Sequence, residues 1–500
     1  MERPKKWNLE ADVVILGYGA AGAAAAISAY DAGAGEILVL EKQAPHEPFG
    51  LPLSSSYMSG GAFICPNDSE NAKRYLNTLY QVSEGLSWTD PEIIEAWTRY
   101  ALENKDWVER MGIRTKLMRH GGEHKLDGWE SIDVYGVIGM GPALVRVLDQ
   151  QVRARRVSIR YETAAKRLIA DENGEVIGVE AVCTKGGAEN TVFIRAHRAV
   201  ILATGGFGFH EEMKLQYLRV CPAYFTGTDA ATGDGIRMAQ ELGAELWHMN
   251  CCSARIVIKI PPVAQGMTVM FGGQNTFSIA GPTAHAGYVM VDRDGKRFTN
   301  ENYKSHSLYY ELTGFDSQRV MFPRVPSYWV FDQARIEDGP LVTNKVGAAG
   351  AAMLYSWSKD NQKELENGWI KTGNTLPELA DKLGLDPAAL EATVSAYNKS
   401  CELGSDAEFH RPPQTLLPLC KPPFYAIEVW PGGPNTQGGP RRNRRAQVMR
   451  TDGTPIPRLF SAGELGSIYG MLYPASGGNI AECIAFGRIA GENASRYPSL

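Results

Sequence analysis

Three glycines near the N-terminus have the spacing that lets a main chain bind a phosphate. They are Gly17, Gly19 and Gly22 of the run GYGAAG. Gly17 permits a tight turn, Gly19 lets the main chain approach a diphosphate, and Gly22 lets a helix pack closely on a strand. A helix that begins in such a turn offers N–H groups and a partial positive charge to phosphates.

The segments around this turn have the hydrophobic pattern of a β-α-β unit. Residues 11–16 and 37–40 are short apolar runs typical of buried parallel strands, and the alanine-rich residues 20–32 favour a helix. Glu41 follows the second run, where its carboxylate can accept two hydroxyls of a ribose. The sequence therefore predicts a dinucleotide site and, from this unit alone, leaves FAD and NAD open.

Two later segments favour FAD. Residues 200–206, VILATGG, resemble the strand and turn that close over the dinucleotide in FAD enzymes. Residues 459–464, LFSAGE, resemble the C-terminal strand of those enzymes, whose acid commonly reaches the ribityl chain. Glu464 is that acid here, so FAD is the expected cofactor.

Composition and cysteine usage exclude several other classes of protein. The chain has 500 residues, 44% of them hydrophobic, and a net charge of −5, which argues against a nucleic-acid surface. Its eight cysteines form no CxxC pair, haem motif or zinc spacing, so no metal is expected. With no signal peptide and no 18-residue apolar run, we expect a reduced, cytoplasmic protein without a membrane span.

The chain is longer than one hydrophobic core usually supports, and its character changes once. Residues 283–432 are richer in aromatics and prolines and contain an expected helix at 376–403. We therefore expect a FAD-binding domain over 1–282 and 433–500, with 283–432 inserted as a catalytic domain. Within the first domain, helices are expected at 69–118, 236–242 and 479–497, and strands at 157–161, 176–179 and 199–203.

Further motifs, taken in order along the chain, give a specific resemblance. They are SYMSGG at 56–61, ATGG at 203–206, TGDG at 232–235, DGKRFTNE at 294–301, SGGN at 476–479 and AFGR at 485–488. With the N-terminal turn, they make the chain resemble the flavoprotein family that holds fumarate reductase flavoprotein subunits and 3-ketosteroid dehydrogenases. The resemblance implies an α/β fold, in which an inserted α+β catalytic domain caps a Rossmann-like FAD-binding domain.

The resemblance also implies a reaction and a set of FAD contacts. The reaction is hydride exchange between flavin N5 and a substrate carbon, with a protein acid or base handling the second proton. The residues implied to bind FAD are Gly17, Gly19, Ala21, Gly22, Glu41, Lys42, Ser56, Gly60, Gly61, Thr204, Gly205, Asp234, Glu464, Ser476, Asn479 and Ile480.

The chain departs from the fumarate reductases at two positions that bind substrate carboxylates. Those enzymes place a histidine just before a Thr-x-Gly-Gly turn and an arginine just before the late Gly-Gly-Asn. Here the positions hold Asn435 and, near the second, Ala475. A four-carbon dicarboxylate would therefore lack its charge-assisted hydrogen bonds, which argues against fumarate or succinate.

A different stretch resembles the 3-ketosteroid dehydrogenases. Tyr473-Pro474-Ala475-Ser476-Gly477 resembles their Tyr-Pro-x-x-Gly run, in which the tyrosine hydroxyl and the glycine N–H hold the ketone oxygen. Removing a proton next to a ketone builds negative charge on its oxygen, and two fixed donors stabilise that charge. Tyr473 and Gly477 are therefore predicted catalytic residues, although Tyr473 could also be a packed core aromatic.

A base is needed as well. Just after the Asn-Glu of DGKRFTNE this family carries its proton-handling residue, and Tyr303 is the nearest tyrosine. The phenol of a free tyrosine has a pKa of ~10, so Tyr303 would need a nearby donor or cation, for which Lys304 and His306 are candidates. Tyr309 and Tyr310 are alternatives. Arg335 could be a proton donor, but a surface or domain-interface ion pair is its more ordinary role.

These motifs predict a FAD-dependent dehydrogenase that introduces or reduces a C=C bond next to a ketone in a cyclic or steroid-like substrate. One alternative is a reductase of an unsaturated carboxylic acid, with the run Arg441–Arg445 as a carboxylate clamp. A cyclic ketone bearing a carboxylate would combine both, and a non-catalytic flavin-binding protein is a third class. Without a haem motif or a second nucleotide turn, electrons are expected to pass to a separate acceptor such as a quinone.

Overall fold

The computed structural model describes residues 4–47, 49–268, 286–302, 305–342 and 353–500, which form two units. The first unit contains Met1–Met213, Gly227–Ser253 and Asn435–Leu500, and the second contains Lys214–Thr226 and Ala254–Pro434. The second unit thus begins earlier in the chain than the expected residue 283. The reason is strand pairing, because β14 (Arg255–Lys259) and β12 (Tyr224–Phe225) both pair with β19 (Phe424–Gly433).

The first unit is built on a mainly parallel sheet that carries the predicted β-α-β unit. Its strand order is β21-β22-β11-β1-β2-β8, and all neighbours from β22 to β8 run parallel. Their bounds are β21 (Gln447–Met449), β22 (Pro455–Ser461), β11 (Asn190–Leu202), β1 (Leu9–Leu16), β2 (Ile37–Leu40) and β8 (Ser158–Arg160). The carboxyl ends of β1, β2 and β11 meet at one edge of this sheet.

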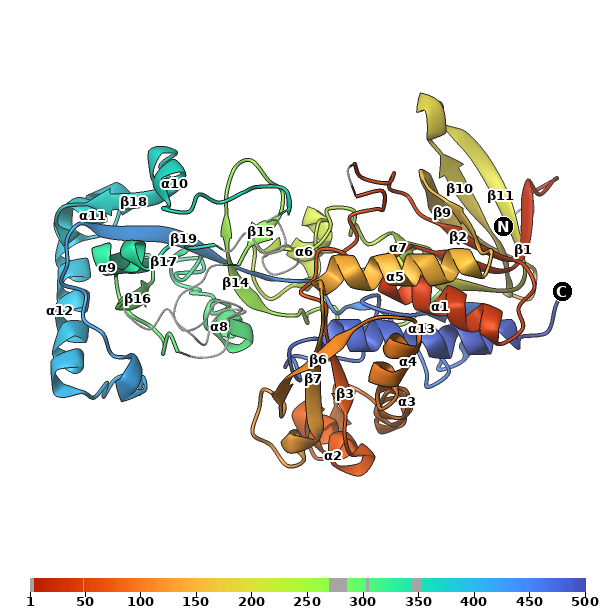
Figure 1. Cartoon of the computed structure of the whole chain (residues 1–500), viewed down its shortest axis with the longest axis horizontal. Helices are drawn as coiled ribbons and strands as arrows, with labels where there is room; N and C mark the ends of the chain where they lie inside the picture. Colours follow the sequence, from red (N-terminus) through yellow and green to blue (C-terminus); the bar gives the residue numbers. More distant parts are fainter. Residues whose placement is uncertain (1–3, 48, 269–285, 303–304, 343–352) are drawn as a thin grey trace. The chain divides into compact units, whose positions relative to one another are not determined.

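Two helices from opposite ends of the chain, α1 (Ala20–Asp31) and α13 (Gly478–Ser495), lie side by side in this unit (Figure 1). The main chains of the two helices come close to each other because small residues lie on their facing sides. A Cβ on Gly491 of α13 would lie 2.3 Å from the carbonyl oxygen of Ala25 in α1. The alanine-rich sequence of α1 thus serves close packing. None of the described helices, α13 included, is long and apolar enough to cross a bilayer.

The remaining elements of the first unit include two antiparallel structures. β9 (Thr163–Ala170) and β10 (Val176–Cys183) form a hairpin that extends from β11, and β3 (Ala62–Pro66), β7 (Ile132–Val137) and β6 (Thr115–His120) form a three-stranded sheet. The helical prediction for 69–118 is correct only in part, because the hairpin β4 (Gln81–Ser83) and β5 (Leu86–Ser87) interrupts it. Besides α1 and α13, the α-helices that lie wholly in this unit are α2 (Ser69–Tyr80), α3 (Pro91–Ala101), α4 (Asn104–Arg110), α5 (Met140–Ala154) and α7 (Asp234–Gln240), and α6 (Glu211–Tyr217) contains the boundary between the two units.

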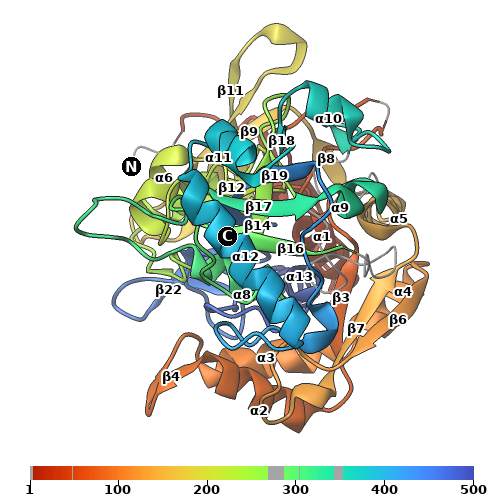
Figure 2. The same cartoon turned by 90° about the vertical axis from the view of Figure 1, so that its left-hand side faces the viewer.

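The second unit combines a mixed sheet with helices of its own. The sheet order is β15-β14-β19-β17-β16, and both β12 and β18 also pair with β19. The bounds not yet given are β15 (Gly266–Met267), β16 (Tyr288–Val291), β17 (Ser327–Asp332), β18 (Ile370–Gly373), α8 (Ser305–Glu311), α9 (Gln333–Glu337), α10 (Gln362–Glu366), α11 (Leu376–Leu383) and α12 (Pro387–Leu403). In Figure 2, α12 crosses in front of β16 and β17, where Val394 joins the same apolar core as Val330.

The single helix expected at 376–403 is two helices, α11 and α12. Gly384, with φ +69°, ends α11 in a left-handed conformation that a glycine adopts without strain. Asp386 then caps α12, because its carboxylate accepts the N–H of Ala388 at 3.0 Å. The stop and start signals therefore outweigh the continuous apolar periodicity of this segment.

Candidate active site

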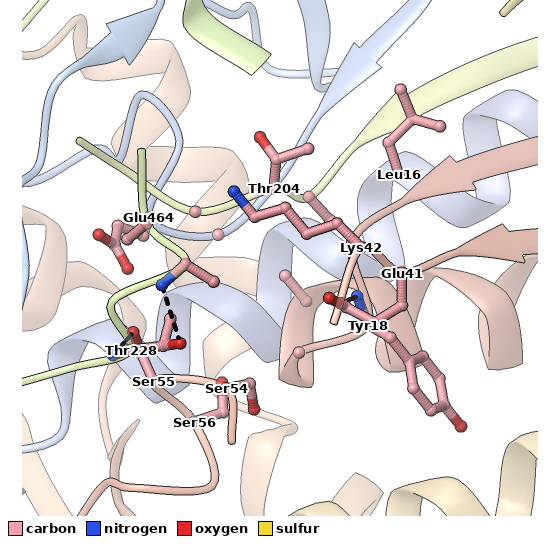
Figure 3. A pocket seen from close by; sticks show the side chains of 18 of the residues that line it. Leu16, Tyr18, Glu41, Lys42, Ser54, Ser55, Ser56, Thr204, Thr228 and Glu464 are labelled. Atoms are coloured by element: carbon pink, nitrogen blue, oxygen red, sulfur yellow. Dashed lines mark hydrogen bonds between the residues drawn. The ribbon is translucent and has the colours of Figure 1, made fainter. Parts of the chain in front are cut away.

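An open cavity of about 810 Å³ lies in the first unit, at the carboxyl ends of β1, β2 and β11 (Figure 3). The lining residues come from the glycine turn, the end of β2, the loop 54–56, the hairpin strand β9, the turn after β11, the loop before α7 and the loop after β22. Segments that are far apart in the sequence thus converge on the predicted dinucleotide site.

The glycine turn has the geometry that its spacing predicts. A Cβ on Gly17, whose φ is +99°, would lie 2.3 Å from the carbonyl oxygen of Ala203. A Cβ on Gly22 would lie 2.1 Å from the carbonyl oxygen of Gly17, whereas one on Gly19 would make ordinary contacts with the hydroxyl of Ser56 at 3.5 Å and the Cβ of Ser54 at 3.8 Å. Packing therefore requires glycine at positions 17 and 22. At Gly19, the absence of a side chain leaves more space for a ligand in the cavity.

Glu41 lies at the end of β2 with its carboxylate fixed by main-chain donors. Oε2 accepts the N–H of Tyr18 at 2.9 Å, and Oε1 accepts the N–H of Gln43 at 2.8 Å. The side chain is buried, and burial raises the pKa of the Glu41 carboxyl. Each oxygen retains a lone pair, so the carboxylate can still accept hydroxyl groups from a ligand in the cavity.

Lys42 joins two walls of the cavity. Its Nζ lies 2.7 Å from Oδ2 of Asp234 and donates to the hydroxyl of Thr232 at 2.8 Å. Burial raises the pKa of the Asp234 carboxyl, but the hydrogen bond and charge of Lys42, together with Arg237, outweigh it and hold the pKa below its ordinary value. Lys42 thus holds the end of β2 against the start of α7.

Hydroxyl groups from two loops also line the cavity, and the sequence predicted only one of them. Ser56 accepts the N–H of Ala20 at 3.1 Å, at the first residue of α1. Ser54 and Ser55 lie beside it, and Ser55 accepts the N–H of Thr228 at 3.3 Å (Figure 3). No sequence motif indicates Ser54, Ser55 or Thr228, because loop closure brings them to the cavity.

Thr204, Gly205 and Glu464 form the wall after β11 and β22. The Oγ1 of Thr204 is buried and has no hydrogen-bond partner within the described parts of the chain. Burial raises the pKa of Glu464 to about 8, partly offset by the N–H of Gly206. A polar atom without a partner and an acid with an elevated pKa in one cavity are typical of a ligand site.

These features fit a flavin dinucleotide. The turn of Gly17 and Gly22 leaves no room for a side chain beside the N-terminus of α1, where a diphosphate is favoured. The carboxylate of Glu41 suits ribose hydroxyls, and the orphaned hydroxyl of Thr204 and the acid Glu464 offer partners at the other end. Fold and site together define a dinucleotide-binding flavoprotein.

Six of the residues that the resemblance associated with FAD lie outside the lining of this cavity: Gly22, Gly60, Gly61, Ser476, Asn479 and Ile480. Gly61, with φ +66°, packs against the start of α5, because a Cβ there would lie 2.5 Å from the carbonyl carbon of Met140. Ile480 is buried, and the hydroxyl of Ser476 donates to Glu123 at 3.4 Å.

A second cluster surrounds the first turn of α13. The hydroxyl of Tyr473 accepts the main-chain N–H of Asn479 at 2.7 Å, and the ring is 6% exposed. Gly477 immediately precedes α13 with φ +88°, and a Cβ there would lie 2.5 Å from the main chain of Ala62. Tyr473 and Gly477 therefore lie at the positive end of one helix, within the same short segment.

The side chain of Asn435 belongs to a network of hydrogen-bonded side-chain amides. The Nδ2 of Asn479 donates to Oδ1 of Asn435, and the Nε2 of Gln437 donates to Oδ1 of Asn479 at 2.9 Å. Asn435 and Gln437 are buried, with 5% and 0% exposure. Gln437 was not predicted, because a lone glutamine in a turn carries no sequence signal.

The predicted base and its neighbours are described only in part. Tyr303 and Lys304 lie outside the described residues. His306, in α8 of the second unit, is buried and accepts a hydrogen bond from Nε of Arg255 in β14 at 3.4 Å. Arg335 is not a surface residue: it is 1% exposed and donates to the carbonyl oxygens of Gly339 and Pro340 at 3.0 and 3.2 Å. Burial lowers the pKa of Arg335 to about 10.

The basic run at 441–445 is not simply a solvated surface loop. Arg442 is fully buried, where it pairs with Glu482 and donates to the carbonyl oxygen of Ser461 at 3.1 Å. Arg441 pairs with Asp90 at 2.6 Å and with Glu245 at 3.0 Å. The two cations nearest the start of the run thus have acidic partners within the protein, which disfavours the proposed carboxylate clamp.

Comparison with known proteins agrees with the geometry. Residues 12–480 match the family model described as "FAD binding domain", and the chain belongs to this family. The protein is therefore a FAD-dependent oxidoreductase related to the fumarate reductases and 3-ketosteroid dehydrogenases that its motifs resemble.

Three curated relatives illustrate the range of the family. Fumarate reductase (cytochrome) of Shewanella frigidimarina is 30% identical over 97% of this chain and 77% of its own length. A 3-oxosteroid 1-dehydrogenase of Mycobacterium tuberculosis is 31% identical over 72% of this chain and 64% of its own. The 4-oxocyclohexanecarboxylate 2-dehydrogenase of Sinomonas cyclohexanicum is 30% identical over 73% of this chain and 62% of its own length.

A solved structure shares the fold. The 3-ketosteroid Δ1-dehydrogenase of Sterolibacterium denitrificans, in complex with 1,4-androstadiene-3,17-dione, matches with a TM-score of 0.82. The match covers 97% of this chain and 99% of that one at 21% sequence identity. The predicted fold class, a Rossmann-like α/β domain with an insertion, is thereby confirmed.

Proposed function

We propose that this protein is a FAD-dependent dehydrogenase that introduces, or in reverse reduces, a C=C bond next to the ketone of a cyclic or steroid-like substrate. The observation that carries the proposal is the hydroxyl of Tyr473 at the N-terminus of α13, hydrogen-bonded to Asn479. The neutral amide of Asn435 replaces a cation at the adjoining position. Neutral donors suit a ketone oxygen, whereas a dicarboxylate requires cations.

In the proposed mechanism Tyr473 and Gly477 act on the ketone oxygen. The hydroxyl of Tyr473 and the N–H of Gly477 donate to that oxygen and stabilise the negative charge that develops when the adjacent carbon loses its proton. When bound, FAD supplies the hydride acceptor. Tyr473 is held by its hydrogen bond to Asn479, so the donor needs no reorganisation during the reaction.

Tyr303 is the proposed base. It follows Asn300 and Glu301 in the sequence, at the place where related dehydrogenases carry a tyrosine. The buried pair of Arg255 and His306 lies on β14 and on α8 of the same unit, two elements that pack together, and could supply the cation that a phenolic base needs. A Tyr303→Phe variant that retains full turnover with bound FAD would exclude this role.

The FAD contacts are proposed from the cavity lining. Lys42, Asp234, Thr204 and Glu464 line the cavity with the glycine turn, and we assign them to FAD with the other predicted contacts. The assignment of Gly60, Gly61, Ser476, Asn479 and Ile480 depends on the resemblance alone. The electron acceptor is proposed to be a separate quinone-like molecule.

A second candidate substrate is a small cyclic ketone that bears a carboxylate. The observation in its favour is the similarity to 4-oxocyclohexanecarboxylate 2-dehydrogenase, whose name specifies such a ketone. Tyr473 would hold the ketone as before, and the carboxylate would require a cation elsewhere. This substrate differs from a steroid in size and charge, so the two can be compared directly.

The experiment is anaerobic bleaching of the bound flavin by a panel of substrates: a 3-ketosteroid, cyclohexanone, 4-oxocyclohexanecarboxylate and succinate. We expect bleaching by at least one ketone and none by succinate. Tyr473→Phe is expected to slow bleaching about 100-fold or more while FAD stays bound, since one oxyanion donor is worth ~10²–10³ in rate. Tyr100→Phe is the matched control, because its hydroxyl bonds Glu492 away from the cavity.

Each alternative has its own result in this panel. Reoxidation of the reduced flavin by small unsaturated acids, with no response to ketones, would support the carboxylic-acid reductase. A flavin that responds to no ketone and no unsaturated acid would support a non-catalytic flavin-binding protein. Full bleaching rates in Tyr473→Phe would remove that residue from the mechanism.

A further inference from the structure

Three side-chain amides meet at the first turn of α13. Asn435 and Gln437 come from the loop after β19, and Asn479 is the second residue of the helix. The Nε2 of Gln437 donates to Oδ1 of Asn479 at 2.9 Å, the Nδ2 of Asn479 donates to Oδ1 of Asn435, and the Nδ2 of Asn435 donates to the carbonyl oxygen of Thr436 at 2.8 Å. The bonds form one directional chain that contains no charge.

This amide chain fixes the orientation of Asn479 at both ends of its side chain. Its carbonyl oxygen and its amino group each have a partner, so the amide cannot rotate without breaking a bond. Gln437 contributes through its amino group, since its Oε1 has no hydrogen-bond partner among the residues that the structure describes. Full burial of Gln437 makes this single bond costly to lose.

The main chain of Asn479 makes the contact that matters for chemistry. Its N–H donates to the hydroxyl oxygen of Tyr473 at 2.7 Å. The second N–H of a helix has no acceptor within the helix, and it lies at the positive end of the helix dipole. A hydroxyl that accepts such an N–H is polarised and becomes a stronger donor to another oxygen.

We propose that Asn435, Gln437 and Asn479 are positioning residues for Tyr473, and that their neutrality makes this site specific for a ketone oxygen. The inference rests on the proposed function. The amide chain holds Asn479 so that its N–H stays directed at the Tyr473 hydroxyl, which then donates to the developing enolate oxygen. A cation in place of any of the three amides would instead favour a carboxylate at this position.

The test is a double-mutant cycle in the FAD-loaded enzyme. Gln437→Met keeps the length of the side chain and removes the donor to Asn479. With wild-type Tyr473 we expect kcat for a bleaching ketone to fall about tenfold and KM to change less than about twofold, since the lost interaction belongs to the transition state. In the Tyr473→Phe background, the same substitution is expected to change kcat less than about twofold.

Two further variants make the cycle decisive. Gln437→Glu replaces the amino group with an oxygen that faces the Oδ1 of Asn479, and the side chain keeps nearly the same volume. If Gln437→Met loses FAD, this variant is expected to show the same fall in kcat instead. Gln151→Met is the matched control, because Gln151 lies on α5 and its Nε2 donates to the carbonyl oxygen of Met111, away from the cavity. Its kcat, flavin absorbance spectrum and melting temperature are expected to remain those of the wild type.

The outcomes separate this inference from the function on which it rests. If the wild type oxidises a ketone but the Gln437 and Tyr473 effects on kcat are additive, the positioning role is overturned and the proposed function survives. If Gln437→Met raises KM and leaves kcat unchanged, the amide of Gln437 contributes to substrate binding rather than to stabilisation of the transition state. The inference is then also overturned. If the wild type oxidises no ketone, both are overturned.

Discussion

Gly22 lies so close to Gly17 that a Cβ on Gly22 would be 2.1 Å from the Gly17 carbonyl oxygen. That oxygen belongs to the main chain of the turn, so it cannot rotate away as a side chain would. Helix α1 therefore begins against β1 only because residue 22 has no side chain. The same contact sets the shape of the turn that forms the floor of the cavity.

The first prediction concerns this contact. Gly22→Ala is expected to displace the start of α1 from the turn and to reduce the FAD content of the purified protein at least tenfold. Overpacking of this kind costs ~1–3 kcal/mol or more in stability. The measurement is the ratio of flavin to protein absorbance. Gly314→Ala is the control, because a Cβ there meets nothing within 4 Å; equal flavin content in both variants would contradict the prediction.

The second prediction concerns Lys42. Lys42→Met removes a cation beside the cavity and leaves the carboxylate of Asp234, which is unfavourable for a diphosphate. We expect the Kd for FAD to rise about tenfold, equivalent to ~1.4 kcal/mol. Titration of the apoprotein with FAD at low salt measures it, and the exposed Lys166→Met provides the control. A Kd unchanged within twofold would show that Lys42 serves only the contact with α7.

The third prediction concerns pH. Burial raises the pKa of Glu464 to about 8 and that of Glu482 to about 7, so the folded apoprotein binds these protons more tightly than the unfolded chain. The free energy of unfolding is therefore greatest below about pH 4.5 for these groups and falls as pH rises toward 8.

Glu464→Gln removes one of these groups and is expected to flatten the pH dependence. Because the cavity is open to solvent, we expect a difference of about 2 kcal/mol between the two proteins in their loss of stability from pH 5 to pH 8. Urea unfolding of the apoproteins at both pH values measures it. Parallel stability curves for the two proteins would argue that Glu464 is ionised without cost.

The fourth prediction concerns the buried pair of Arg442 and Glu482. Arg442→Met leaves the carboxylate of Glu482 without its cation in the core, which typically costs ~3–5 kcal/mol. Arg442→Met combined with Glu482→Leu is expected to recover most of that loss, because an apolar pair fills the same space. Unfolding measurements compare the two. A double variant that is stable but no longer turns over any substrate would instead favour the carboxylate clamp.

The glycine turn and the acid after β2 could be predicted from the sequence because their function is local. Gly17, Gly19, Gly22 and Glu41 lie within one β-α-β unit, and the main-chain geometry of that unit follows from the order of its segments. The hairpin turn at Gly85 and the helix end at Gly384 were equally local, but the apolar periodicity on either side obscured them. The second unit begins before residue 283 because β14 pairs with β19 across a long stretch of chain.

By itself, the sequence determined the class of cofactor, the family and the presence of Tyr473 and Gly477 in one segment. Only the tertiary structure decided which residues meet, because no spacing along the chain encodes those contacts. Lys42 reaches Asp234 across 192 residues, Arg442 is buried against Glu482, and Gln437 and Asn435 close on Asn479. Each contact forms when separate loops pack around the same sheet edge or helix end, where a buried polar group must find a partner.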